Sequence, residues 1–556
     1  MDRLAGAVRL RPIEDIKIAN PWEQLLIPLL FLAIPLGVSF WTVTGVLDQY
    51  AEFRWFLTGL GCALLLAGGA VTGFRLELPA FRARPATWIL FGITAFFALI
   101  PAVRTFPGIL ENKGMEWICF LVLFFWSCSL GARAESRELF LRSIRFANRI
   151  GLFAVAGYLI AQKAGFRWRY LASSGPVDTS LFGNKNFAAS YFGIAVLIHL
   201  HGFRRNRRAG ELLVDSIPAL LGVYGLVSMK ARGASLGFAA GLLLLLWSKV
   251  RWNPARKAAV AAGLFLPLLI WFCILSYRGV TPDADSRSFR LARWLNTAAM
   301  IADHPLGIGP GRYRFAYLSY SSRIRNDIEI ADGRVSLTPH NLPLQIAVES
   351  GLITALAAFL ALGLILVRAW RSDPATVAVA GSILVDGIFA FPLDVPYSFM
   401  AFAVFSGLAF ASGGSPFTVW SLGRLRIPVL LTAAAMAVFL VCDFTAVLSE
   451  SFDINDPASM RRSCERAPWR MVACLQLARI EGNHGNFREG IRLAKSVLRR
   501  QPDDFNAHFL ISELYRLSGD SQSYCTHLSR YDSELGARTR FHAEVLKNCP
   551  PVTGKP

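Results

Sequence analysis

The sequence predicts an all-α membrane protein: a polytopic helical bundle of about 12 to 13 spans with a large polar loop and a small soluble helical-repeat tail. The first observation is composition, because 54% of the 556 residues are hydrophobic and the mean hydropathy is +0.42. The second is arrangement, since the apolar residues form long blocks instead of helical stripes. The third is that polar stretches between blocks are short, except for residues 277–341 and the tail.

The chain divides into a polar N-terminal segment of residues 1–23, a transmembrane domain of residues 24–447 and a tail of residues 448–556. Blocks of about 17–25 apolar residues are long enough to cross a bilayer. The predicted spans lie at about 24–46, 55–73, 87–103, 115–131, 148–163, 187–200, 213–229, 233–248, 258–276, 342–369, 375–392, 397–411 and 427–447.

The basic residues predict how these spans are oriented. The chain has 58 Lys and Arg against 38 Asp and Glu, a net charge of +20. Such a balance also occurs in nucleic-acid-binding proteins. Here the basic residues gather in alternate short loops, which the positive-inside rule assigns to the cytoplasm. We therefore expect a cytoplasmic N-terminus, and loop 277–341 and the tail on the opposite side.

The tail shows a 34-residue period. Pro468 and Pro502, and Gly485 and Gly519, are separated by this interval. The order of helix, Gly turn, helix and Pro is typical of tetratricopeptide repeats. Such repeats stack on neighbours, and the neighbour could be further helix of the tail or a partner protein. The tail also has four cysteines without zinc-ligand spacing, which are Cys464, Cys474, Cys525 and Cys549.

A polar stripe begins where loop 277–341 runs into an apolar block. We expect His340 in the first turn of a helix, followed by Asn341, Gln345 and Glu349 on one face. Polar groups in a membrane helix usually face a bundle interior or a wet cavity. A helix N-terminus disfavours imidazolium, so a neutral His340 could serve as a general base. The alternative is a polar helix cap at the membrane interface.

Several cations are placed to bind an anion on the same side. Lys230 and Arg232 lie in a very short turn between two spans, where a guanidinium could bind a lipid phosphate or where both residues could simply snorkel. Arg290 and Arg293 belong to a predicted amphipathic helix over 286–302, whose polar face could equally be solvated.

Three further polar residues are candidates for substrate contacts. Arg312 lies beside a glycine-rich turn, and Asn184 and Asn186 precede a span on the outer side. The asparagines could bind sugar or phosphate, or cap the helix. Asp283 and Asp285 form a D-x-D pattern without an evident third ligand, and nucleotide-binding motifs are lacking. We therefore expect neither a metal ion nor a cofactor.

Taken together, these motifs resemble the O-antigen ligase and O-antigen polymerase superfamily of bacterial inner-membrane glycosyltransferases. His340-Asn341 is followed after nine residues by Gly351 and Thr354. An Arg-x-x-x-Trp pattern at 290–294 precedes the His-Pro-x-Gly-x-Gly-x-Gly run of 304–311. The Gly-Asn-x-Asn-Phe and Arg-Gly-Ala segments stand at 183–187 and 232–234.

The resemblance implies transfer of a glycan from undecaprenyl pyrophosphate to an acceptor hydroxyl at the periplasmic face, without metal or nucleotide. His340 would be the base, and Arg232 and Arg290 would hold the pyrophosphate. The wider substrate site would include Lys230, Asn184, Asn186, Arg293, Arg312, Asn341 and Glu349. The acceptor would be a glycan, a lipid or a protein, and the tail could bind a protein partner; a nucleic acid is not expected.

Three alternatives remain open from the sequence. A polymerase of the same superfamily would use another lipid-linked repeat unit as its acceptor. A polysaccharide or lipid transporter would also have about twelve spans, but is expected to show internal repeats or broken helices in matching halves. A scaffold would use the tail to recruit partners.

Overall fold

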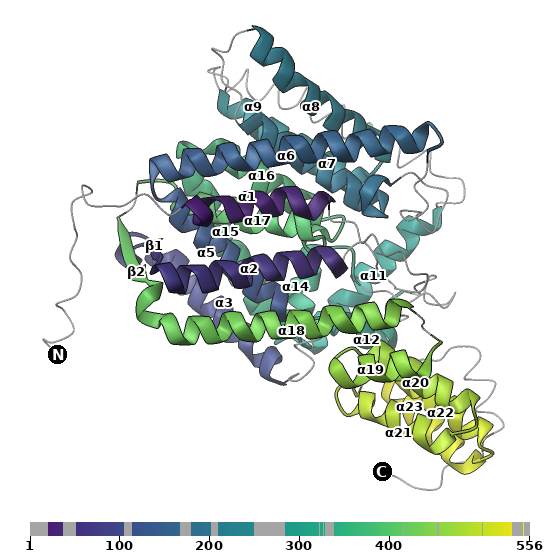
Figure 1. Cartoon of the computed structure of the whole chain (residues 1–556). Helices are drawn as coiled ribbons and strands as arrows, with labels where there is room; N and C mark the ends of the chain where they lie inside the picture. The colour runs from purple at the N-terminus through teal and green to yellow at the C-terminus, as the bar shows by residue number, and fades with distance from the viewer. Residues whose placement is uncertain are drawn as a thin grey trace, which may run out of the picture.

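The computed structural model is a bundle of long helices with a smaller helical tail at one end (Figure 1). It describes residues 21–36, 52–104, 114–166, 179–201, 209–249, 284–321, 323–325, 327, 338–414, 416–452, 455–502, 504–535 and 549. The predicted block 258–276 and Asp283 lie outside the described residues, as does most of the N-terminal segment.

The described part of the bundle is all-α apart from one short strand pair. Its helices are α1 (Pro21–Leu36), α2 (Glu52–Thr72), α3 (Pro85–Arg104), α5 (Gly114–Gly131), α6 (Ala134–Lys163), α7 (Lys185–His201), α8 (Ala209–Met229), α9 (Arg232–Lys249), α15 (Leu352–Ser372), α16 (Pro374–Gly387), α17 (Pro396–Ala411) and α18 (Arg426–Phe452). Loop 277–341 contributes α11 (Ala284–Asp303) and α12 (Tyr313–Ala316), and α14 (Leu342–Ser350) follows it.

These helices confirm an all-α polytopic membrane protein. Among the described residues, six helical stretches are long and apolar enough to cross a bilayer, and five shorter apolar helices accompany them. Each predicted block coincides with a helix so far as it is described, with one exception. The predicted span 342–369 is wrong, because the chain breaks at Gly351 into α14 and α15.

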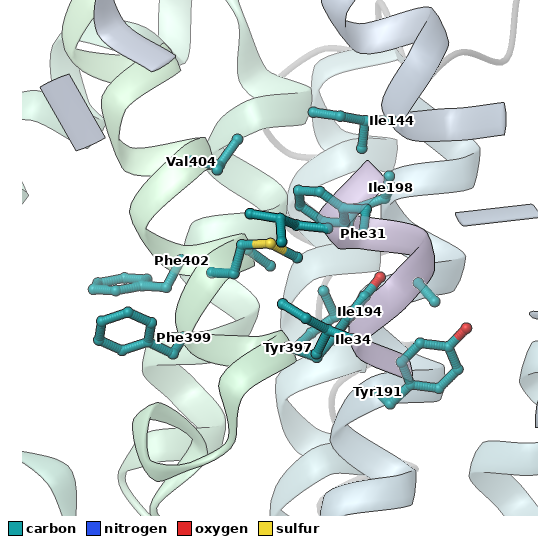
Figure 2. Packing of buried hydrophobic residues seen from close by; sticks show 14 of the residues in the cluster. Phe31, Ile34, Ile144, Tyr191, Ile194, Ile198, Tyr397, Phe399, Phe402 and Val404 are labelled. Atoms are coloured by element: carbon teal, nitrogen blue, oxygen red, sulfur yellow. The ribbon is translucent and has the colours of Figure 1, made fainter. Parts of the chain in front are cut away.

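Aromatic residues from three helices pack against one another at the centre of the bundle. Phe31 of α1 and Tyr191 of α7 both meet Tyr397 of α17 edge-on, with ring centroids 5.7 and 4.7 Å apart (Figure 2). The Tyr397 hydroxyl donates to Asn148 Oδ1 of α6 (2.6 Å), and Asn148 Nδ2 donates to the Ala195 carbonyl (2.8 Å). Hydrogen bonds inside an apolar core fix the relative positions of these helices, because an unpaired polar group there is costly.

So far as they are described, the loops that carry the predicted cytoplasmic arginines lie at one end of the bundle, here called the inner end. Strand β1 (Arg75–Pro79) pairs antiparallel with β2 (Phe417–Ser421), with Arg75 opposite Ser421. Arg133 Nε donates to Glu77 Oε1 of β1 at 2.9 Å. In Figure 1 this end lies at the left. Which end faces the cytoplasm stays a prediction.

So far as they are described, the loops predicted on the opposite side lie at the other end, here called the outer end. The α8–α9 turn at 230–231, the segment 388–395 and residues 179–184 before α7 lie there, together with α11, α12 and α14 (Figure 1). Arg54, just before the apolar part of α2, donates to the Leu181 carbonyl (2.5 Å) and lies over the Phe182 ring. The two groups of loops are thus separated as the charge alternation predicts.

The tail lies beside the outer end of α18 (Figure 1). It contains α19 (Pro457–Arg466), α20 (Met471–Asn483), α21 (Phe487–Leu498), α22 (Phe505–Leu517) and α23 (Ser521–Leu535). Two hairpins start 34 residues apart, at 471 and 505, and turn at Gly485 and Gly519, both with positive φ. Disulfides join Cys464 to Cys474 and Cys525 to Cys549. The tetratricopeptide assignment itself stays a prediction.

Candidate active site at the outer end

The break at Gly351 is the structural centre of the outer end. Ile308 N donates to the Val348 carbonyl and Gly309 N to the Glu349 carbonyl, each at 2.9 Å, and Leu352 N donates to the Pro305 carbonyl at 2.9 Å. Carbonyls at a helix end lack intrahelical partners and need others. The glycine-rich segment 304–311 supplies them, which is why the predicted continuous span ends here.

Only glycine fits where this segment meets α14. Gly307 has φ +88°, and a Cβ built on it would lie 2.6 Å from Glu349 O. Gly351 has φ +96°, and its Cβ would lie 2.8 Å from Leu306 C. Both contacts are with main-chain atoms that cannot move aside. The two sequence motifs at 304–311 and 340–351 therefore form one rigid unit.

His340 lies two residues before the start of α14, not in its first turn as predicted. Asn341 is the N-cap: its Oδ1 accepts a hydrogen bond from Leu344 N (3.0 Å), and its Nδ2 donates to the Ile388 carbonyl (3.0 Å). Asn341 thus fixes the turn that carries His340, and we assign it this positioning role. His340 itself has φ +53°, an uncommon conformation that occurs often at functional sites.

His340 is held among aromatic and cationic groups. Its ring meets Phe391 edge-on with centroids 4.9 Å apart. Trp294 Nε1 of α11 donates to the Pro339 carbonyl at 3.0 Å. Burial, followed by the positive charges of Arg293 and Arg290, lowers the pKa of His340 to about 3. The imidazole is therefore neutral at physiological pH, as predicted, but burial and arginines are the cause and not a helix terminus.

The two candidate arginines of α11 have different surroundings. Arg293 has 1% of its side chain exposed, and its Nε lies 3.1 Å from Oδ2 of Asp327, whose side chain is fully buried. Tyr317 donates to the same carboxylate oxygen at 3.0 Å. Arg293 is therefore part of a buried structural network. Arg290 is half-buried one turn earlier and near enough for its charge to act on His340.

The end of α16 and the residues that follow it contact the remaining sequence motifs near His340. Phe391 meets both His340 and Phe187, the latter with centroids 5.5 Å apart. Asp386 accepts a hydrogen bond from Ser190 Oγ at 2.5 Å, and a Cβ on Gly233 would lie 2.8 Å from Asp386 Oδ1. The segments 183–187, 232–234 and 340–351 therefore converge on residues 386–391.

Sequence reasoning missed Asp386 and Phe391. Asp386 is buried, and its Oδ1 has no hydrogen-bond partner among the described residues. The available signal was a carboxylate inside the apolar block 375–392, because an ionisable residue within a span usually marks a functional site. Phe391 offered no comparable signal, since a phenylalanine near the end of an apolar block is ordinary.

The other predicted residues occupy a range of positions. Arg232 begins α9 and is half-buried, whereas Lys230 is exposed in the preceding turn with φ +52°. Asn184 accepts a hydrogen bond from Asn186 N (2.8 Å) and so shapes the start of α7. Of the last two predicted residues, Arg312 is half-buried at the start of α12 and Glu349 is buried on α14.

Comparison with known proteins gives a family match over the region that contains these residues. Residues 217–359 match the family model described as O-antigen ligase. The match covers 143 of 556 residues and includes Arg232, Arg290, His340 and Gly351. No curated protein sequence matches the chain. The family match supports a membrane glycosyltransferase of ligase or polymerase type that uses a lipid-linked glycan donor.

Proposed function

We propose that this chain is an inner-membrane, O-antigen ligase-like glycosyltransferase. It transfers a glycan from undecaprenyl pyrophosphate to an acceptor hydroxyl at the periplasmic face, independently of metal ions. The observation that carries the proposal is that His340 and the start of α9 both lie against residues 386–391, while the charges of Arg293 and Arg290 of α11 act on His340. The family match of residues 217–359 supports the same reaction class.

In the proposed reaction His340 accepts the proton of the acceptor hydroxyl. The acceptor oxygen forms a bond to the anomeric carbon as the bond from that carbon to the diphosphate oxygen breaks. Negative charge grows on the leaving diphosphate, and Arg232 and Arg290 stabilise it through paired N–H donors. The proton on His340 then passes to water, and the lipid diphosphate leaves.

The arginines also affect the strength of the base. In the free site burial and then the charges of Arg293 and Arg290 lower the pKa of His340, so the imidazole is a weak proton acceptor. A bound diphosphate offsets this positive charge, and an opposite charge nearby favours the imidazolium form. Donor binding would therefore raise the pKa of His340 toward the range of an effective general base. The base becomes effective once the leaving group is in place.

Two features support donor binding at the membrane boundary. Arg232 stands at the start of α9, where free N–H groups and the helix dipole favour an anion. The diphosphate of a lipid carrier is held near the headgroup level, where the outer ends of α7 and α9 would lie. Asp386, buried beside Gly233, would orient the start of α9 or accept a hydrogen bond from a sugar hydroxyl.

The test uses full-length protein in lipid nanodiscs with an undecaprenyl-pyrophosphate-linked glycan. We expect His340→Ala to lower transfer by about 10²- to 10⁴-fold, the usual contribution of a general base. His201→Ala is the control, because His201 lies beside Asp373 at the inner end and so outside the proposed site. Wild-type transfer rates in the His340 variant would contradict the proposal.

Glycan analysis of a deletion strain separates the acceptors. A ligase predicts that full-length glycan accumulates on the lipid carrier and is lost from its final acceptor. A polymerase predicts that single repeat units accumulate instead. The His-Asn-x9-Gly pattern at 340–351 favours the ligase.

A further inference from the structure

Helix α12 lies between the bundle and the tail. On one side Tyr313 and Tyr317 pack with Met300 of α11 and Val348 of α14. On the other side Phe315 packs into the tail, in a buried cluster with Met471, Cys474, Val497 and Ala507. Figure 1 shows α12 directly against the tail helices. One turn of helix therefore connects the tail to the helix that follows His340.

The tail is also attached to the bundle through α18. Asp443 Oδ1 accepts hydrogen bonds from Trp469 Nε1 (2.9 Å) and Arg470 Nη1 (3.4 Å). Phe439, one turn earlier, stacks on Trp469 with centroids 4.8 Å apart. Met471 follows directly in the chain and packs against Phe315. The attachment to α18 thus fixes the tail where it contacts α12.

A set of contacts leads from this interface to α11, and Trp294 of α11 donates to the Pro339 carbonyl next to His340 at 3.0 Å. Tyr317, two residues after Phe315, donates to Asp327 Oδ2 at 3.0 Å. Asp327 pairs with Arg293 inside the protein. Tyr313 in turn hydrogen-bonds Thr297 of α11 at 3.0 Å. A shift of α12 would therefore move the buried network that stands beside His340.

We propose that the tail is an integral part of the transferase and that Phe315 is the positioning residue through which it holds α12, Asp327 and Arg293 in the arrangement the reaction needs. The inference rests on the proposed function. Displacement of catalytic groups by about 1 Å can cost about 10²-fold in rate. The tail then acts on catalysis through its packing against α12, instead of only recruiting a partner.

The two disulfides of the tail provide a matched pair for testing this inference. Cys464–Cys474 joins α19 to α20, and Cys474 belongs to the cluster around Phe315. Cys525–Cys549 starts from α23, which packs against α22. Both crosslink the tail, but Cys474 lies in the cluster around Phe315, whereas Cys525 lies on α23, outside the described residues of that cluster.

The first experiment compares Phe315→Ala and Phe315→Leu in the full-length protein. We expect the alanine variant to lose about tenfold to a hundredfold in kcat, with a smaller change in the KM for donor, because Arg232 on α9, one of the two arginines proposed to hold the diphosphate, lies outside this interface. Leucine should restore most of the rate. Hydrogen exchange of α12 and of residues 338–350 should increase in the alanine variant. An unchanged kcat in Phe315→Ala would overturn the inference.

The second experiment replaces each disulfide by a serine pair. Cys464→Ser with Cys474→Ser should lower kcat and increase exchange in α12, whereas Cys525→Ser with Cys549→Ser should do neither. Equal loss in both double variants would show general unfolding of the tail and would contradict the specific role of the interface. If the wild-type chain transfers no glycan, the proposed function fails, yet exchange in α12 still reports whether the tail holds it.

Discussion

Arginines have different surroundings at the two ends of the bundle. At the inner end guanidinium groups meet anionic or carbonyl partners: Arg133 pairs with Glu77, Arg137 with Asp373, and Arg84 donates to the carbonyls of Phe410 and Ser412. At the outer end Arg54 and Arg293 also have carbonyl or carboxylate partners, but there the charges of Arg293 and Arg290 add to burial in lowering the pKa of His340. Arginines therefore join segments at both ends, and at the outer end they also act on a histidine.

Backbone conformation separates the two ends in the same way. Among the described residues, the non-glycine residues with positive φ are Ser180, Lys230 and His340. All three lie in the connections of the outer end. Such conformations cost free energy and persist where the surroundings enforce them, often at functional sites. The inner end is thus built for stability and the outer end for a function, and substitutions at each end should have different effects.

Of the substitutions that compare the two ends, Gly307→Ala is expected to have the largest effect on transfer. The new Cβ would lie 2.6 Å from Glu349 O at φ +88°, so segment 304–311 would separate from α14 and shift His340. We expect transfer to fall by more than about 10²-fold. Gly73→Ala at the inner end is the matched control, because φ is +69° there but nothing lies within 4 Å of the added Cβ. Similar losses in the two variants would remove the distinction between the ends.

A smaller effect is expected for Arg232→Lys. A lysine keeps the charge at the start of α9 but lacks the paired donors that match a diphosphate. We expect kcat/KM for the donor to fall about tenfold, equivalent to about 1.4 kcal/mol. Arg142→Lys is the control, since Arg142 is exposed on α6 and pairs with Glu138. Wild-type kinetics in Arg232→Lys would favour interface snorkelling.

The sequence predicts the helices well, because length and apolarity of a block determine whether it can span a bilayer. It also predicts a neutral His340. It does not predict the break at Gly351, since the N–H groups that satisfy Val348 and Glu349 come from Ile308 and Gly309, about forty residues earlier. A hydrophobicity profile contains no information about such main-chain partners.

The candidate site shows the same limit. Arg232, Arg290 and His340 could be proposed from motifs whose order resembles a family. Whether an arginine binds substrate or forms a structural pair depends on its partner in space. Arg293, one helical turn after Arg290, has the buried carboxylate of Asp327 beside it. The convergence on Asp386 depends on close packing of α9 against α16 at Gly233, which sequence spacing alone does not show.

The pH dependence of transfer tests whether the pKa of His340 is lowered. Free imidazole has a pKa of about 6.5, whereas that of His340 is lowered to about 3 by burial and the arginines. The unprotonated form therefore persists on acidification, and kcat/KM should show no loss from His340 between about pH 7 and pH 5. If donor binding raises this pKa, kcat should decline at a higher pH than kcat/KM does. An acid limb of kcat/KM near pH 6.5 would contradict the proposed environment.

The smallest expected effect on transfer comes from Arg137→Ala at the inner end. Burial alone would raise the pKa of Asp373, but the hydrogen bond and charge of His201 and the charge of Arg137 lower it overall. Removing Arg137 leaves a largely buried carboxylate with less compensation, which we expect to cost about 3 kcal/mol of stability. The midpoint of thermal unfolding in detergent should fall by several degrees, while kcat per folded molecule stays unchanged. A lower kcat at unchanged stability would mean that the inner end takes part in catalysis, because a residue that only joins loops affects the amount of folded protein and not its rate.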